Sequence, residues 1–192
     1  MEAEDRIKLF GMSHSLVERE MDKVEKEYQV DLRRLEKKDD KDEEYYPQFD
    51  LALRTEAAQM AKHYEVFYCL EKNIRKLISE TLESACGENW WATCVPQPVK
   101  DNVKSNIQRE IDNGISLRSE HEIDFTTFGE LGEIVRNNWE RFDAMFTSEK
   151  AFSKIMTSLN MLRNPIAHCC PMAEDEVTRL QLTLRDWFRL ME

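Results

Sequence analysis

Long hydrophobic runs are missing from this chain of 192 residues. No apolar stretch approaches the ~18 residues that a membrane-spanning helix needs, and Glu2, Glu4 and Asp5 disrupt any N-terminal signal peptide. Glycine and proline are scarce, with five of each, whereas 34% of the residues are charged. This composition is typical of helices joined by short connections. We therefore expect a cytoplasmic, mainly helical protein with no membrane association and enough residues for one good core.

Regular cysteine spacing is also lacking. The five cysteines include no CxxC pair, and their odd number fits a reducing compartment better than a disulfide scaffold. Five side chains are candidate zinc ligands by residue type: Cys86, Cys94, His168, Cys169 and Cys170. Their spacing matches no common zinc site, so we expect neither a metal nor a cofactor. Cys169 and Cys170 are interpreted as small buried hydrophobes.

An excess of positive charge is absent, because the net charge is −11 at pH 7. This argues against a protein that coats nucleic acid through bulk electrostatics, but it leaves room for a nuclease with a local basic pocket. The acid is concentrated at one end, since residues 1–46 contain fifteen acidic and ten basic side chains. We interpret this region as a solvated, charged element.

The N-terminal region carries an apolar seam at alternating three- and four-residue spacing. The seam consists of Ile7, Phe10, His14, Val17, Met21, Val24, Tyr28, Asp31 and Leu35. Such a stripe over four heptads predicts a helix that packs along another helix. One arm of a helical hairpin is favoured over a partner-binding coiled coil, because apolar stripes usually serve packing.

A second long helix is predicted from about Gln48 to Cys86, with Gly87 placed to end it. A helix of this length is too long for one small bundle. Its first half is expected to pair with the N-terminal helix, and its second half to enter the main core. We therefore predict an acidic helical hairpin extension over residues 1–60 and a helical domain over residues 61–192.

The rest of the chain contains start signals for four more helices. They stand at Pro98, Thr127, Ser148 and Pro171. Pro98 suits a first helical turn, and Thr127 with Glu130 forms a capping box. The stretch 115–124 is polar and is predicted to be a loop. No convincing strand pattern occurs, so the fold class is predicted to be all-α.

Two adjacent tryptophans, Trp90 and Trp91, follow the second long helix. Aromatic side chains can stack on bases in proteins that bind single strands. More often they close the end of a helical core. We favour the core interpretation.

The hexapeptide RNPIAH, Arg163 to His168, joins a phosphate-binding residue type to one that transfers protons near neutral pH. In an unbroken helix, residues five apart lie ~140° around the axis. Pro165 is expected to stop or kink the helix between Arg163 and His168, so that both point into one cleft. Asn164 is placed to cap the next turn or to orient His168.

These residues suit the cleavage of RNA, which carries its own nucleophile in the 2′-hydroxyl. His168 can act as base or acid, and Arg163 can stabilise the charged transition state. One histidine cannot do both tasks in one turnover, so a two-fold dimer that brings a second motif to the cleft would complete the site.

The segment LRNPIAH resembles the signature of the HEPN superfamily, the higher eukaryotes and prokaryotes nucleotide-binding domains. ENWW at 88–91 and DFTTFGELGEIVRNNWERF at 124–142 extend the resemblance. These segments look like the HEPN domain of a eukaryotic nuclear RNA-surveillance endonuclease, which also has relatives among bacterial defence proteins. The resemblance covers about residues 62–191.

The resemblance implies a bundle of four to five helices, a homodimer and a metal-independent ribonuclease site. Arg163, Asn164 and His168 match the family's arginine, polar residue and histidine, and are the expected catalytic residues. The expected partners are an RNA substrate, a second copy of the chain and, for a defence or toxin effector, an inhibitor or antitoxin protein. Glu71 and Arg75 are either supports of the site or ordinary polar positions.

A second hypothesis is a non-catalytic helical module that binds a partner protein or a nucleotide. In that case Arg163 could pair with Glu133 or Glu140, and His168 could cap a helix. Exposed motif residues close to their two-fold mates would favour the nuclease. Motif residues that are buried, paired or far apart would favour the module.

Overall fold

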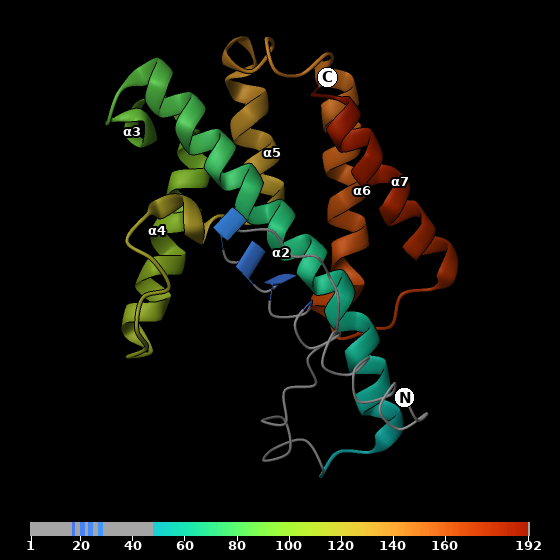
Figure 1. Ribbon diagram of the computed structural model, residues 1–192. Coiled ribbons are helices and arrows are strands. Elements are labelled where there is room, and N and C mark those ends of the chain that lie inside the picture. The colour runs from blue at the N-terminus through green and yellow to red at the C-terminus, as the bar shows by residue number, and fades with distance from the viewer. Residues whose placement is uncertain (1–16, 18–19, 22, 25–26, 29–47, 192) are drawn as a thin grey trace, which may run out of the picture. The chain divides into compact units, whose positions relative to one another are not determined.

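A computed structural model describes residues 17, 20–21, 23–24, 27–28 and 48–191 (Figure 1). The chain divides into two compact units, Met1–Gln48 and Phe49–Glu192. In the first unit, the seven described residues before Gln48 are helical, and Val17, Val24 and Tyr28 among them are exposed. The rest of the predicted heptad seam lies outside the described residues, and the hairpin stays a prediction.

The second unit begins with the long helix α2, Leu51–Cys86. The side chain of Asp50 caps its start by accepting a hydrogen bond from the Ala52 amide at 2.8 Å. Gly87, with a φ of 76°, ends it as predicted. The predicted boundary near residue 60 falls inside α2, whereas the two compact units divide just before the helix. The assignment of residues 1–60 and 61–192 as domains stays a prediction.

The apolar stripe of α2 is used in its second half alone. Its buried side chains are Phe67, Leu70, Ile74, Ile78 and Leu82. These residues recur every three or four positions, which places them on one face of the helix. The apolar residues of the first half, such as Leu51 and Leu53, are exposed. The second half of α2 therefore forms part of the core.

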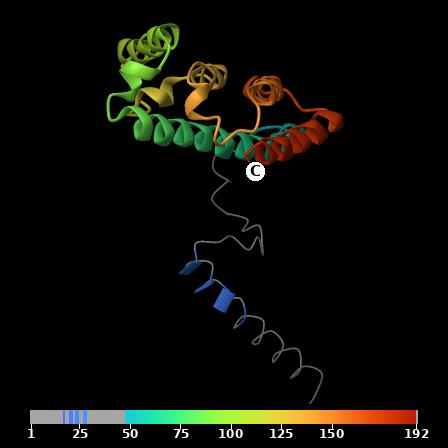
Figure 2. The ribbon, with the colours of Figure 1, turned by 90° about the horizontal axis from the view of Figure 1, so that it is seen from above.

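Shorter helices complete the second unit. They are α3 Trp90–Cys94, α4 Gln97–Asp112, the 3₁₀ helix η2 Glu122–Phe125, α5 Phe128–Asn137, the 3₁₀ helix η3 Trp139–Arg141, α6 Glu149–Ala167 and α7 Glu174–Arg189. Figure 2 shows α5 and α6 end-on and side by side, with α2 lying across them. The residues that the structure describes contain no strand, which confirms the all-α prediction.

Two predicted helix starts are confirmed in atomic detail. The Thr127 amide donates to Glu130 Oε2 at 2.6 Å, and the Glu130 amide donates to Thr127 Oγ1 at 3.4 Å, so both halves of the capping box of α5 form. Ser148 Oγ accepts from the Ala151 amide at 3.3 Å and begins α6. The last helix starts later than predicted, at Glu174. Its first turn is acidic, which suits the positive end of the helix dipole.

The stretch 115–124 is more ordered than a polar loop. Its end forms η2, which buries Ile123 and Phe125 against the core. The polar composition of the segment did not predict the burial of Ile123 and Phe125, because these two apolar residues alternate with the polar residues of η2. Trp90 and Trp91 are partly buried and pack against the core, as predicted.

The prediction that Cys169 and Cys170 are buried is wrong. Cys169 and Cys170 are exposed rather than buried, because they follow the last turn of α6, where the chain turns outward. Cys86, at the end of α2, is joined in a disulfide to Cys94, at the end of α3, with Cα atoms 7.4 Å apart. An odd cysteine count does not exclude a single pair.

The prediction that the helix stops or kinks between Arg163 and His168 is confirmed, because α6 ends at Ala167, two residues beyond Pro165. The helix runs through Pro165 to Ala167, and the His168 amide still donates to the Asn164 carbonyl at 3.0 Å. Pro165 lies in the last turn, so its ring removes one backbone hydrogen bond and the partly buried Ile166 still packs on the core.

The chain leaves α6 through a Schellman turn with an unusual residue at its centre. The Cys170 amide donates to the Pro165 carbonyl at 2.8 Å, and the Cys169 amide donates to the Ile166 carbonyl at 3.2 Å. Cys169 takes the left-handed conformation with a φ of 54°. Glycine usually fills this position, because a Cβ atom makes the conformation unfavourable.

We expect Cys169→Gly to raise the free energy of unfolding by about 0.5–1 kcal/mol, because the strain relieved at this φ exceeds the flexibility that glycine adds to the unfolded chain. Urea denaturation measures the change. Cys170→Gly is the matched control, since its φ is not positive, and it should lower the stability slightly. A loss of stability in Cys169→Gly equal to that of the control would contradict the assignment of strain.

Candidate functional site

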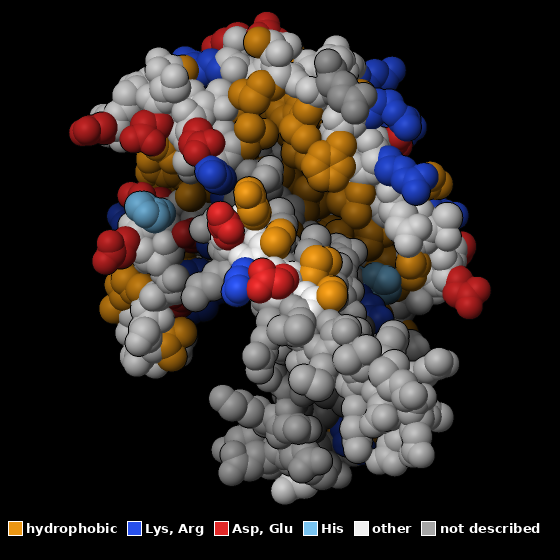
Figure 3. Space-filling view, in the orientation of Figure 1, with side chains coloured by type: hydrophobic (Ala, Val, Ile, Leu, Met, Phe, Trp, Pro, Cys, Tyr) orange, Lys and Arg blue, Asp and Glu red, His pale blue; other side chains and the backbone are white. Residues whose placement is uncertain are grey.

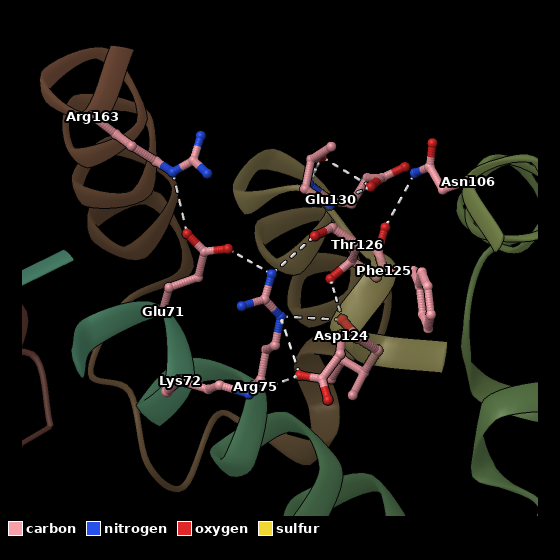
Figure 4. Close-up of polar contacts among 11 residues, drawn as sticks. Glu71, Lys72, Arg75, Asn106, Asp124, Phe125, Thr126, Glu130 and Arg163 are labelled. Carbon is pink, nitrogen blue, oxygen red and sulfur yellow. Dashed lines mark hydrogen bonds and ion pairs between the residues drawn. The ribbon is translucent and has the colours of Figure 1, made fainter. Parts of the chain in front are cut away.

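The motif arginine is held by a glutamate from the long helix. Arg163 Nε, on α6, donates to Glu71 Oε2, on α2, at 3.2 Å (Figure 4). The other oxygen of Glu71 accepts from Arg75 Nη2 at 2.5 Å. The side chains of Glu71 and Arg75 are only 14% and 13% exposed, whereas that of Arg163 is 36% exposed. Glu71 thus orients Arg163, and the guanidinium of Arg163 still reaches solvent.

Arg75 in turn anchors the 3₁₀ helix η2. Its Nε donates to the Ile123 carbonyl at 3.1 Å, and its Nη2 donates to the Thr126 carbonyl at 2.9 Å. The Ile123 carbonyl also accepts from the amide and the hydroxyl of Thr126, at 3.2 and 2.7 Å, so Arg75 adds to the hydrogen bonds that close η2. A single chain of contacts therefore connects α6, α2 and η2.

Asp124 closes this chain of contacts from the side of η2. It accepts from Ser119 Oγ at 2.6 Å and from Lys72 Nζ at 3.3 Å, and it lies 3.9 Å from Arg75 Nε. Burial by itself would raise the pKa of Asp124, but the hydrogen bonds from Ser119 and Lys72 outweigh it and hold the pKa below its ordinary value. The carboxylate is therefore charged at neutral pH.

We expect Asp124→Asn to lower the free energy of unfolding by about 1 kcal/mol at pH 7, because the amide loses the charge-assisted bonds. A lowered folded pKa means that the contribution is complete above the unfolded value of about 3.9 and disappears as the pH falls through the folded value. The stability difference from the parent should therefore shrink below about pH 4. Urea denaturation at several pH values, with the exposed Asp143→Asn as control, measures it. A difference that does not depend on pH would contradict this role.

A cavity of about 610 Å³ opens beside these residues. Its lining is Tyr64, Phe67, Tyr68, Glu71, Lys72, Arg75, Arg118, Asp124, Arg163, Ile166 and Ala167. Four of these side chains are cationic and two are anionic, so the cavity has a local positive surplus in a chain of net charge −11. Such a surplus favours an anionic ligand.

Arg118 enters the cavity from the loop before η2. It forms an ion pair with the buried Glu110 of α4, and its guanidinium lies 5.1 Å from the ring centre of Phe125. The side-chain hydrogen bond from Arg118 lowers the pKa of Glu110. The pair fixes one wall of the cavity.

The other two motif residues lie outside the cavity lining. Asn164 and His168 are exposed at the end of α6, and the His168 imidazole makes no hydrogen bond or ion pair within the described part of the chain. The structure places Arg163 in the lining of this cavity and His168 outside it, so the two side chains do not share this cavity within one protomer. Arg163 pairs with Glu71 rather than with Glu133 or Glu140.

Sequence reasoning found only part of this site. The sequence offers Glu71 and Arg75 either as supports of the site or as ordinary polar positions, and the structure pairs Glu71 with Arg163 and Arg75 with Glu71. Tyr64, Tyr68 and Lys72 were not recognised as cavity residues, although they follow the spacing that places them on the face of α2 shared with Glu71 and Arg75. No local sequence pattern predicts that Arg118 and Asp124 line the cavity, because their positions depend on how the loop before η2 folds back.

No cluster of three or more His, Cys, Asp or Glu side chains within the described ranges is placed to hold a metal ion. No helix of these ranges is long and apolar enough to cross a membrane.

Comparison with known proteins gives one match. The family model for Swt1-like HEPN matches residues 65–192, which is two thirds of the chain and includes every residue of the cavity lining except Tyr64. Membership of this family is consistent with a ribonuclease or nucleotide-related function. No curated protein and no solved structure matches the chain.

Proposed function

This chain belongs to the Swt1-like HEPN family, and on that premise we propose that it is a metal-independent RNA endonuclease with a composite site at a homodimer interface. The observation that carries the proposal is the way in which Arg163 is held. It contacts Glu71 through Nε alone, so both terminal Nη atoms point away from Glu71 at the edge of a net-positive cavity (Figure 4). A guanidinium held in this way can bind two oxygens of one phosphate.

The proposed reaction uses the 2′-hydroxyl of RNA as nucleophile. A histidine accepts its proton, the 2′-oxygen forms a bond to phosphorus, and the bond from phosphorus to the 5′-oxygen breaks. An acid returns a proton to that oxygen, so the products are a 2′,3′-cyclic phosphate and a 5′-hydroxyl. Arg163 stabilises the negative charge that builds on the phosphate oxygens, and His168 is the proton acceptor or donor.

A second copy of the chain would supply what one protomer lacks. His168 is exposed and not part of the Arg163 cavity of its own chain. A two-fold axis near the end of α6 would bring two Arg163 and two His168 side chains to one cleft, with one histidine as base and the other as acid. The exposed Asn164 would then bind the phosphate or orient an imidazole through its amide.

The alternative function is a non-catalytic module that binds a partner protein or a nucleotide. The ion pair between Arg163 and Glu71 favours it, since a paired arginine is what a structural role requires. The exposure of Asn164 and His168 favours the nuclease. A defence or toxin effector, restrained by an inhibitor or antitoxin protein, is the setting that we propose for the nuclease.

The test is incubation of the purified protein with structured and single-stranded RNA in EDTA, together with a mass measurement of its oligomeric state. We expect cleavage that chelation does not affect and products that end in a 2′,3′-cyclic phosphate. A folded dimer that leaves both RNAs intact would overturn the nuclease in favour of the binding module. Loss of cleavage in EDTA would overturn the metal-independent mechanism.

A further inference from the structure

The proposed reaction leaves two aromatic residues of the cavity without a role. Tyr64 and Tyr68 lie one turn apart on α2, with ring centres 6.1 Å apart and planes inclined by 41°. Their exposed fractions are 61% and 54%. The buried face of α2 consists of other residues, among them Phe67 and Leu70. Core packing therefore does not account for either tyrosine.

Both rings line the same cavity as Arg163. One part of its wall is aromatic and apolar, formed by Tyr64, Phe67, Tyr68, Ile166 and Ala167, and the other is charged. Elsewhere on the second unit, Figure 3 shows hydrophobic side chains gathered over α5 and α6, with Lys and Arg side chains along the edge formed by α7. Tyr68 lies about 6 Å along the helix axis from Lys72, since each residue rises about 1.5 Å.

This arrangement has the two parts that a nucleotide needs. Cationic side chains suit its phosphate, and an exposed ring suits the face of its base. A base can stack on a side chain only when at least one of its faces is free. Inside a duplex, neighbouring bases cover both faces. Sequence-tolerant RNA binding therefore targets unpaired nucleotides.

We propose that Tyr64 and Tyr68 stack on unpaired bases beside the phosphate held by Arg163, and that they restrict the enzyme to single-stranded RNA. This inference rests on the proposed ribonuclease function. The tyrosines are specificity-determining residues, because they contact the bases and take no part in the transfer of protons. The RNA strand, rather than a free nucleotide, is the ligand that fits the proposed reaction.

The test measures binding where cleavage is blocked, by fluorescence anisotropy of labelled RNA with full-length His168→Ala. Tyr64→Ala and Tyr68→Ala together should weaken binding of single-stranded RNA by about tenfold or more, because each stacked base contributes this order of affinity. The pair Tyr64→Phe and Tyr68→Phe keeps both rings and should bind within about twofold of the parent. Binding of a blunt RNA duplex should not change.

Phe188→Ala is the matched control, because Phe188 is a ring of similar exposure, 60%, on α7. It should leave the affinity unchanged, and circular dichroism verifies that each variant folds. Unchanged affinity in the alanine pair, or an equal loss for single-stranded and duplex RNA, would overturn the stacking role. Adenosine monophosphate is tested as a competitor. If it competes as strongly as the RNA strand and binds more weakly to the alanine pair, the ligand is a free nucleotide and the proposal of an RNA strand is overturned.

The two proposals fail in different ways. Cleavage by the parent protein with tyrosine-independent binding would overturn the stacking role and support the nuclease. Tyrosine-dependent binding of single-stranded RNA by a parent protein that never cleaves it would overturn the nuclease and support the stacking.

Discussion

Replacing His168 with alanine is expected to lower the rate of RNA cleavage by about 10²–10⁴-fold, because a positioned acid or base contributes that much. The imidazole is exposed and has no partner within residues 48–191, so its removal leaves no unsatisfied buried group. The melting temperature should stay within a few degrees of the parent value. Single-turnover cleavage of a labelled RNA, in EDTA and with enzyme in excess, measures the chemical step directly.

His121→Ala is the matched control for this experiment. His121 is also an exposed histidine of the second unit, and it lies outside the Arg163 cavity. Its replacement should leave the cleavage rate unchanged. Equal rates in the parent and His168→Ala would place the activity in another site or in a contaminant, and the motif would lose its proposed role.

Phe152→Ala is expected to lower the free energy of unfolding by about 3–5 kcal/mol, because it removes a fully buried ring and leaves a cavity. Phe152 has no exposed surface, and its ring centre lies 5.0 Å from Phe146, 6.0 Å from Trp139 and 6.1 Å from Trp187. These side chains join η3, α6 and α7. Since a domain has only about 5–15 kcal/mol of stability, the loss should be evident in urea denaturation as a lower midpoint.

The exposed Phe188→Ala serves as control for size and residue type, and should change the stability by less than about 0.5 kcal/mol. A small effect in Phe152→Ala would mean that the aromatic cluster relaxes around the missing ring. The contribution assigned to this cluster would then be wrong.

The helices of the second unit could be predicted from local signals. Thr127 with Glu130 and Ser148 cap α5 and α6 through atoms three residues apart, so the sequence contains the whole interaction. Gly87 ends α2 because few other residues accept its φ of 76°. Pro165 likewise predicts a helix end between Arg163 and His168, and α6 ends at Ala167.

The motif could be found from the sequence, and its surroundings could not. Arg163, Asn164 and His168 lie within six residues and are visible as a string. Glu71 lies 92 positions before Arg163, and Asp124 lies 52 positions after Lys72. No local pattern relates residues so far apart, because the contacts form only when α2 packs across α6 and η2.

The sequence by itself determined the helical class, most helix ends and the charge of the chain. It also places, within six residues, one residue type that can bind phosphate and one that can transfer protons. These properties depend on backbone propensity and on neighbours a few residues away. Only the tertiary structure decided that Glu71 holds Arg163, that Tyr64 and Tyr68 share its cavity, and that His168 faces outward. Those relations arise from the packing of distant segments, whose free energy depends on shape and burial rather than on the order of residues along the chain.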